Sequence, residues 1–442
     1  MKRILSLFFI LGIFVALKAE HIAVRIYTTA NITLLNTSFD LGSYNLYAND
    51  TLLIDSLIGT GHSVEFKAIE GQVNLSVDGH NYGRYNKARL QAIDSACILC
   101  LNPANGKQRT YEGSMDIRSK NGRLLLINDV DFETYLAGVA QSEIYGHESD
   151  IYRVQAVISR TWAMRNINKH AAEGFNFCDD VHCQAYHNRC IRPEIMLGTL
   201  ASTGETIVDA SGNLIETPFH ANSGGQTSNS EDVWKNAVPY LRSVPDTFSL
   251  SMKQAHWSKK IKADKWLNYF AKNHGINTKD KNLRDSLLHF QQPQRRADIL
   301  GVRLVRVRMD FGLRSTFFNV TFDSVRNEIT LNGHGYGHGV GLSQEGTINM
   351  VRQGISYDSI IRHYYTGAYI KNDRSIEEEV RTENLTRHIE TIIEEDRQKT
   401  TQKKSKQDDW LGRLFRILDR EEREEVYDEK KQDLEDDWKY EW

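Results

Sequence analysis

The sequence is poor in proline and cysteine, and neither sign of charge is in large excess. With 6 Pro and 30 Gly among 442 residues, it is neither collagen-like nor a proline-rich low-complexity chain. Hydrophobic residues make up 40% of it, which is enough for a large core and excludes disorder throughout. A net charge of -3 gives no argument for a nucleic-acid partner. At about 150 residues per domain, the length suggests two to three domains.

Long apolar runs are absent except near the start of the chain. Residues 4–17 are apolar, follow the basic pair Lys2-Arg3 and precede the small residue Ala19. This layout is typical of a secretory signal peptide, here over residues 1–19. An uncleaved anchor helix is the alternative, but such a span needs about 20 residues. We therefore expect an exported protein of the periplasm or cell wall, with no membrane span after cleavage.

The five cysteines are an odd number, so at least one is not paired with another cysteine of the chain. An exported protein can keep disulfides. Cys97 and Cys100 have the spacing of a redox motif, but they lie in an apolar stretch typical of a buried strand. No helix pattern follows, as a thioredoxin-type site would need. A local disulfide or two buried thiols are the interpretations that remain.

The patterning predicts an α+β protein in three parts. Residues 20–110 form a β-rich N-terminal region, because short alternating apolar runs recur between turn signals. Residues 111–370 mix helix and strand patterns and form the second part. Residues 371–442 form a charged helical or partly disordered tail, with a net charge of -8 over 376–442. An apolar stripe at 410–418 favours a solvated helix there, with a helix that docks a partner as the alternative.

The middle region is predicted in more detail from hydrophobic spacing and caps. Helices are expected at 132–144, 151–172, 254–291, 344–353 and 357–365. Strands are expected at 205–209 and 214–220 (as a hairpin), 302–309, 317–322 and 328–331.

One carboxylate lies on the apolar face of the first of these helices. Phe132, Leu136, Val139 and Glu143 follow the i, i+4, i+7, i+11 spacing of a single face. A carboxyl group in that position is partly desolvated, which raises its pKa and suits a general acid. The alternative is a helix-end glutamate whose head group reaches water or pairs with an arginine. Glu143 is our candidate catalytic residue.

Two thiols and an imidazole lie within six residues, at Cys178, His182 and Cys183. Cysteine thiolate and histidine nitrogen are the usual ligands of zinc, and a compact loop can bring all three to one ion. The fourth position would be water, His187, Cys190 or a distant residue. A disulfide between Cys178 and Cys183 is the rival interpretation in an exported protein. The spacing does not decide between a zinc site and this disulfide.

Two glycine-containing polar segments, 219–227 and 333–344, are candidates to bind a polar ligand. Glycine lets backbone approach a ligand closely. In an extended 333–344, His334 and His338 would lie on the same face, and the spacing of the glycines is not that of a dinucleotide fingerprint. An ordinary tight turn and a bend with satisfied histidines are the alternatives. The candidate binding side chains are Ser223, Gln226, His334, Tyr336 and His338.

In this order, these elements resemble the SpoIID/LytB family, named after stage II sporulation protein D. The resemblance covers about residues 110–370. It is carried by the motifs at 111–114, 129–136, 154–157, 160–161, 182–184, 223–225, 231–234, 239–241 and 333–344.

The resemblance implies a lytic transglycosylase, with residues 111–370 as its mixed α/β catalytic core and substrate groove. Such an enzyme cleaves peptidoglycan glycan strands between N-acetylmuramic acid and N-acetylglucosamine and leaves 1,6-anhydromuramoyl ends, preferentially on strands stripped of stem peptides. The resemblance places the catalytic glutamate at Glu143. It also implies a structural zinc at the Cys178, His182 and Cys183 loop.

Two departures from the family pattern lie next to these motifs. Ile144-Tyr145 stands where the family often has Met-Pro, and Glu345 stands where an aromatic residue usually follows Ser-Gln. The LytB side of the family implies another function, in which the chain binds glycan without cleaving it and its tail docks a cell-wall amidase. A zinc-dependent hydrolase is a third interpretation, and it requires an open position on the metal.

Overall fold

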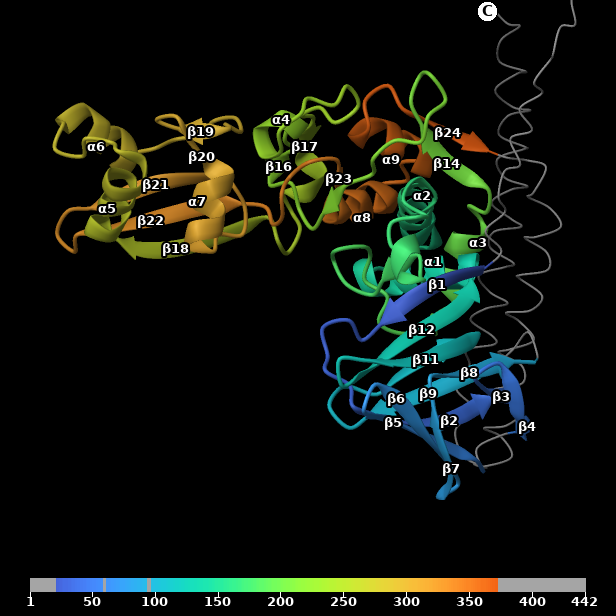
Figure 1. Ribbon diagram of the computed structural model, residues 1–442. Coiled ribbons are helices and arrows are strands. Elements are labelled where there is room, and N and C mark those ends of the chain that lie inside the picture. The colour runs from blue at the N-terminus through green and yellow to red at the C-terminus, as the bar shows by residue number, and fades with distance from the viewer. Residues whose placement is uncertain (1–20, 59–60, 94–96, 373–442) are drawn as a thin grey trace, which may run out of the picture.

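The computed structural model describes residues 21–58, 61–93 and 97–372 (Figure 1). The predicted signal peptide and all but the first two residues of the predicted tail lie outside the described residues. The α+β prediction is confirmed: a β-rich N-terminal part is followed by a part in which helices and strands alternate. No helix among the described residues is long and apolar enough to cross a membrane.

The N-terminal part consists of two sheets that share one hydrophobic core. Inward residues alternate along the strands, as Val73 and Leu75 do on β6, because successive side chains point to opposite faces. The seven-stranded sheet has the order β13 (Phe177–Cys178), β1 (His21–Ile26), β12 (Arg123–Asp131), β11 (Ser114–Lys120), β8 (Lys87–Ala92), β3 (Ser43–Ala48), β4 (Thr51–Ile58). The six-stranded sheet has the order β10 (Arg109–Glu112), β9 (Ile98–Pro103), β2 (Leu34–Leu41), β5 (Ser63–Ile69), β6 (Gln72–Val77), β7 (His80–Tyr85).

The seven-stranded sheet joins the two regions that the sequence divides at residue 110. β1 pairs antiparallel with β12 and parallel with β13, which carries Cys178 of the candidate metal loop. β11 and β12 continue the same sheet towards β8. Strands from before and after residue 110 therefore pair with each other in one sheet. The domain boundary at this residue stays a prediction.

The two cysteines of the N-terminal part are buried thiols. Neither Cys97 nor Cys100 is in a disulfide among the described residues. The Sγ of Cys97 lies 3.3 Å from the carbonyl oxygen of Ser43 and donates to it. The structure therefore has two buried thiols at these positions rather than a local disulfide.

A helical layer follows directly from β12. α1 (Phe132–Glu143) begins at Asp131, whose carboxylate accepts the N–H of Thr134 at 2.9 Å and caps the helix. The next helix, predicted over 151–172, is shorter: α2 spans Ser149–Arg165, and the chain re-enters only the 3-10 turn η1 (Ala171–Glu173). α2 ends at Asn166, whose backbone N–H and side-chain amide both donate to the carbonyl of Trp162, at 3.0 Å and 2.8 Å. The other helices of the layer are α3 (Pro193–Leu200), α8 (Gln344–Arg352) and α9 (Tyr357–Tyr364).

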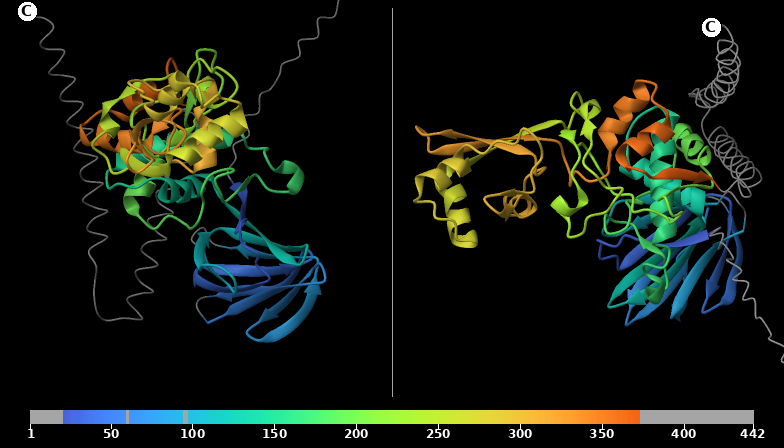
Figure 2. Two further views of the ribbon diagram at one scale, coloured as in Figure 1. Left: turned by 90° about the vertical axis from the view of Figure 1, so that its left-hand side faces the viewer. Right: turned by 90° about the horizontal axis from the view of Figure 1, so that it is seen from above.

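Residues 256–334 form an arm that projects from the rest of the molecule (Figures 1 and 2). The arm has a hydrophobic core of its own around Trp266 and Phe270. Its sheet has the order β18 (His256–Lys262), β22 (Glu328–His334), β21 (Phe318–Asp323). Its other elements are α5 (Ala263–His274), α6 (Lys281–Leu288), α7 (Leu304–Phe311) and the short pair β19 (Asp298–Ile299) and β20 (Val302–Arg303).

Two predictions on this arm are wrong. Residues 256–262 form a strand rather than the start of a helix, because they pair along their whole length with β22. Residues 304–309 form helix α7 rather than a strand. The alternating apolar residues of 302–309 suggested a strand, yet the buried residues are Leu304, Val307 and Phe311, at helical spacing.

Strand pairing at the centre brings distant segments together. β14 (Glu205–Val208) pairs with β24 (Tyr369–Asn372), and only an isolated bridge between Val208 and Leu214 joins it to its predicted hairpin partner. β15 (Phe219–His220) pairs in parallel with β23 (Leu342–Ser343). This second pairing places the two polar segments side by side. The remaining elements are β16 (Gly225–Gln226), α4 (Ser230–Val233), β17 (Pro245–Asp246) and η2 (Thr247–Ser249).

Candidate active site and metal centre

Glu143 is the last residue of α1 and lies where three segments meet. Its Oε1 accepts a hydrogen bond from the backbone N–H of Ala185 at 2.8 Å. Its backbone carbonyl accepts from Nε2 of Gln344, the first residue of α8, at 2.9 Å. The carboxyl group is therefore held between the candidate metal loop and the end of the glycine-rich segment.

Burial raises the pKa of Glu143 above its ordinary value of 4.5, and the Ala185 N–H offsets only part of this rise. Leu136 and Val139, on the same helix face, are fully buried, so the predicted apolar stripe is present. In the described part of the chain, no Lys or Arg forms an ion pair with this carboxylate. A carboxyl group with this environment suits proton transfer.

Four side chains, rather than three, meet at the candidate metal loop: His170, Cys178, His182 and Cys183, with ligand atoms all within 4.8 Å of one another. The Sγ of Cys183 lies 3.5 Å from Nε2 of His170, and the Sγ of Cys178 lies 3.6 Å from Nδ1 of His182. A tetrahedral zinc with two sulfur and two nitrogen ligands has edges of roughly 3.5 Å. The residues therefore fit a metal ion closed by four protein ligands.

His170 is the member of this cluster that sequence reasoning missed. It lies eight residues before Cys178, on the turn that follows α2, so the His/Cys spacing could have included it. Its Nδ1 lies 2.5 Å from Oε1 of Glu173, a carboxylate partner that orients a metal-bound imidazole. His187 and Cys190, considered for the fourth position, lie outside the cluster. Cys178 and Cys183 are thiols in the structure, so the rival disulfide is not formed.

The candidate metal loop continues directly into the residues that hold the acid. The side-chain oxygen of Gln184 accepts from the hydroxyl of the buried Tyr135 at 3.2 Å. The next residue, Ala185, donates to Glu143. Because Cys183 precedes these two residues, the fold of the loop fixes the hydrogen bond to the carboxyl group.

The two polar segments are in backbone contact along their length. The N–H of Asn222 donates to the carbonyl of Tyr336 at 3.0 Å, and the N–H of Tyr336 donates back at 2.8 Å. Gly224 and Gly335 have φ of 70° and 76°, and a Cβ on either would lie 2.5 Å from backbone of the other segment. Glycine is required at both positions because the chains touch there.

Ser223 and Gln226 are engaged within the protein. Ser223 is fully buried, and its hydroxyl donates to Asp246 at 2.6 Å and lies 2.8 Å from the hydroxyl of Ser249. The amide of Gln226 donates to Ser243 at 2.9 Å and accepts the backbone N–H of Arg295 at 3.0 Å. These contacts favour a role in shaping the segment, and direct glycan contacts by the two residues stay a prediction.

The predicted histidines have different neighbours. The ring of His334 lies 5.3 Å from that of His256, and burial lowers its pKa. The ring of His338 lies 5.4 Å from both His220 and Trp234. Burial, with help from nearby arginines, lowers the pKa of His338 to about 4. Both imidazoles are therefore neutral at pH 7.

Tyr336 is the most open of the predicted binding residues, with 42% of its surface exposed. The guanidinium of Arg314 lies over its ring, 5.4 Å from the centroid. This places an aromatic ring and a cation together at the surface of the glycine-rich segment.

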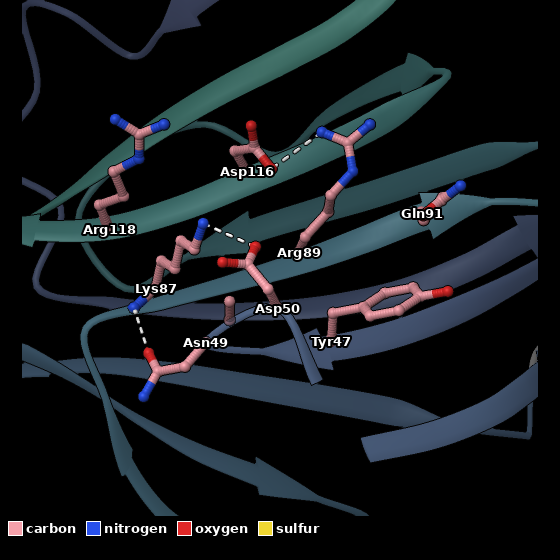
Figure 3. A pocket seen from close by; sticks show the side chains of 9 residues that line it. Tyr47, Asn49, Asp50, Lys87, Arg89, Gln91, Asp116 and Arg118 are labelled. Carbon is pink, nitrogen blue, oxygen red and sulfur yellow. Dashed lines mark hydrogen bonds and ion pairs between the residues drawn. The ribbon is translucent and has the colours of Figure 1, made fainter. Parts of the chain in front are cut away.

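A cavity of about 350 Å³ lies on the seven-stranded sheet (Figure 3). Much of its charge is paired: Lys87 with Asp50 at 2.6 Å and Arg89 with Asp116 at 2.9 Å. None of the predicted site residues lines it, so it is separate from Glu143. Its lining residues are Tyr47, Asn49, Asp50, Lys87, Ala88, Arg89, Gln91, Asp116 and Arg118.

Comparison with known proteins agrees with these observations. The family model of SpoIID, the stage II sporulation protein, matches residues 120–210, which hold both Glu143 and the candidate metal loop. Stage II sporulation protein D of Bacillus subtilis is 26% identical over 266 residues, which are 55% of this chain and 75% of the relative. These similarities support the resemblance of this chain to the SpoIID/LytB family.

Two other proteins are similar to this chain as well. An uncharacterized protein of Brachyspira hyodysenteriae is 26% identical over 281 residues, 61% of this chain and 74% of that protein. The amidase enhancer of Bacillus subtilis is 26% identical over 216 residues, 36% of this chain and 30% of the relative. These relatives are consistent with a role at the cell wall.

The two departures from the SpoIID/LytB pattern contact each other. The hydroxyl of Tyr145 donates to Oε1 of Glu345 at 2.6 Å. Oε2 of Glu345 accepts from Nδ2 of Asn222 at 2.7 Å and from the backbone N–H of Gln254 at 2.9 Å. Glu345 is 1% exposed, whereas Tyr145 is 52% exposed. The buried carboxylate thus fixes an open aromatic ring two residues from Glu143.

Proposed function

We propose that this protein is an exported lytic transglycosylase of peptidoglycan. It would cleave the bond between N-acetylmuramic acid and N-acetylglucosamine, on strands that lack stem peptides. The observation that carries the proposal is the environment of Glu143: it is partly buried, has no cation partner among the described residues, and is oriented by the Ala185 N–H. The similarity to the stage II sporulation protein family and its relatives supports it.

One carboxyl group is sufficient for the proposed reaction. Protonated Glu143 gives its proton to the glycosidic oxygen as the bond from C1 of the muramoyl sugar breaks. The C6 hydroxyl of the same sugar then attacks C1 and forms the anhydro ring, and Glu143 takes up the hydroxyl proton. Because no water attacks, the second carboxylate of a hydrolase is not required.

The four-residue His/Cys cluster would hold a structural zinc. When four protein ligands occupy all positions of a tetrahedral zinc ion, no position remains for water. The ion would then cross-link the loop. The same closure argues against the zinc-dependent hydrolase. In our proposal, the chain's own contribution is the position of Ala185, which follows the cluster by two residues and orients the acid.

The alternative function is a non-catalytic enhancer of a cell-wall amidase. The similarity to a protein named amidase enhancer supports this alternative. In this alternative, Glu143 hydrogen-bonds a sugar without transferring a proton. The predicted charged tail, outside the described residues, would dock the amidase.

Mass spectrometry of glycan products separates these two functions. The mature protein, Glu143→Gln and the control Glu148→Gln are each incubated with purified glycan strands that lack stem peptides. Glu148 lies on the same segment and pairs with Arg352 at the surface. We expect 1,6-anhydro ends from the wild type and the control but not from Glu143→Gln. Glycan binding without any product, together with stimulation of an amidase, would instead establish the enhancer.

A further inference from the structure

Three arginines near the glycine-rich segment have no acidic partner among the described residues. Arg295 donates to neutral acceptors, including the carbonyls of Ser223 and Gln226, both at 2.6 Å. Nε of Arg308 donates to a backbone carbonyl at 3.3 Å. Arg314 donates to a side-chain amide at 3.0 Å. This part of the surface therefore carries positive charge that the protein does not neutralise.

Burial lowers the pKa of two of these arginines. Burial and the charge of Arg308 lower the pKa of Arg295 to about 9. Burial also lowers the pKa of Arg308, and the same guanidinium contributes to the low pKa of His338. Cations without a counter-ion in a partly buried position are unfavourable, so an anion brought by a ligand would be bound well there.

Exposed aromatic rings accompany these charges. Tyr336 is 42% exposed and lies beneath Arg314. Trp234 is 40% exposed and packs against His338. Aromatic rings have an apolar body with a polar tip and suit the faces of sugar rings. Together with the arginines, they favour a sugar that carries a negative charge.

A continuous set of contacts links this surface to the candidate acid. Arg314 donates to the side chain of Gln254 at 3.0 Å, and the N–H of Gln254 donates to Glu345 at 2.9 Å. Glu345 accepts from Tyr145 at 2.6 Å, two residues after Glu143. A glycan whose scissile bond lies at Glu143 would place a neighbouring sugar towards Arg314.

We propose that Arg314, beside Tyr336, binds the free carboxylate of an N-acetylmuramic acid residue in the glycan strand. This inference rests on the proposed function, because it concerns the same substrate. In a strand that carries stem peptides, this carboxyl group is an amide and has no charge for a guanidinium to pair with. Arg314 thus selects muramoyl residues without peptide.

Binding measurements in the Glu143→Gln background test this assignment without cleavage of the ligand. Calorimetry compares a glycan oligosaccharide that lacks stem peptides with a chitooligosaccharide of equal length, which is neutral. The test variant is Arg314→Gln, at an exposed position. The control is Arg326→Gln, an exposed arginine on the same arm that pairs with Asp323.

We expect Arg314→Gln to weaken binding of the charged glycan about tenfold or more and to leave the chitooligosaccharide unaffected. Arg314→Lys should restore part of the loss, since it keeps the charge. Equal weakening for both ligands, an effect as large from Arg326→Gln, or no binding of either ligand would overturn the assignment. Selective binding together with a wild type that forms no anhydro ends would overturn the transglycosylase and leave the arginine site standing.

Discussion

Replacing Glu133 by Gln tests how α1, which carries Glu143, is anchored. The Glu133 carboxylate forms a two-point pair with Arg160 of α2, with Nε–Oε1 at 3.1 Å and the second nitrogen at 2.6 Å from Oε2. Glu133 is 6% exposed and Arg160 is 2% exposed. Glutamine keeps the shape and one acceptor but removes the negative charge.

The expected cost is large because Arg160 would remain buried without a counter-ion. Removing one partner of a buried pair costs about 3–5 kcal/mol, against a typical total stability of about 5–15 kcal/mol. Arg160 also donates to Ser202 and to the carbonyl of Glu205. These neutral acceptors keep its nitrogens satisfied, so we expect the lower end, about 3 kcal/mol.

Urea unfolding followed by circular dichroism measures this cost. The matched control is Glu216→Gln, which breaks the exposed pair of Glu216 with Arg165 at the end of the same helix. An exposed pair contributes at most about 1 kcal/mol. The reasoning is refuted if Glu133→Gln destabilises the protein no more than Glu216→Gln does.

Three further predictions concern the site and its surroundings. Gly138→Ala should destabilise the protein by about 1–3 kcal/mol in thermal unfolding, because a Cβ would lie 2.5 Å from the ring of Tyr186; unchanged stability would contradict this. Cys183→Ser should abolish stoichiometric zinc in elemental analysis, while Cys190→Ser retains it; equal zinc content in both would count against the cluster. Since the protonated form of Glu143 is the acid and burial raises its pKa above 4.5, kcat/KM should fall as pH rises through that higher pKa. An alkaline limb at or below 4.5 in the pH profile would argue against it.

Hydrophobic spacing predicted those elements whose conformation is determined by local interactions. The helix that ends at Glu143 and the apolar face beneath it follow from spacing alone, because α1 packs that face on buried strands. The strand at 256–262 could not be predicted this way. Only Ile261 and part of Trp257 are sheltered there, so long-range pairing with β22 decides the conformation.

The candidate site shows the same limit. Cys178, His182 and Cys183 are neighbours in sequence and were found by inspection. His170 joins them only because the turn after α2 brings its ring to the loop. Tyr145 and Glu345 are 200 residues apart in the sequence. Their contact could therefore not be predicted from the two departures from the family pattern.

The pairing of β1 has a consequence for the time course of synthesis. β1 is the first described strand to leave the ribosome, but it lies between β12 and β13, whose paired residues follow about 100 and 150 positions later. At about 5–20 residues per second, β1 waits roughly 5–30 s for these neighbours. The sheet therefore cannot close in step with translation, and a chain held unfolded until both neighbours have been made would avoid incorrect pairing at its free edges.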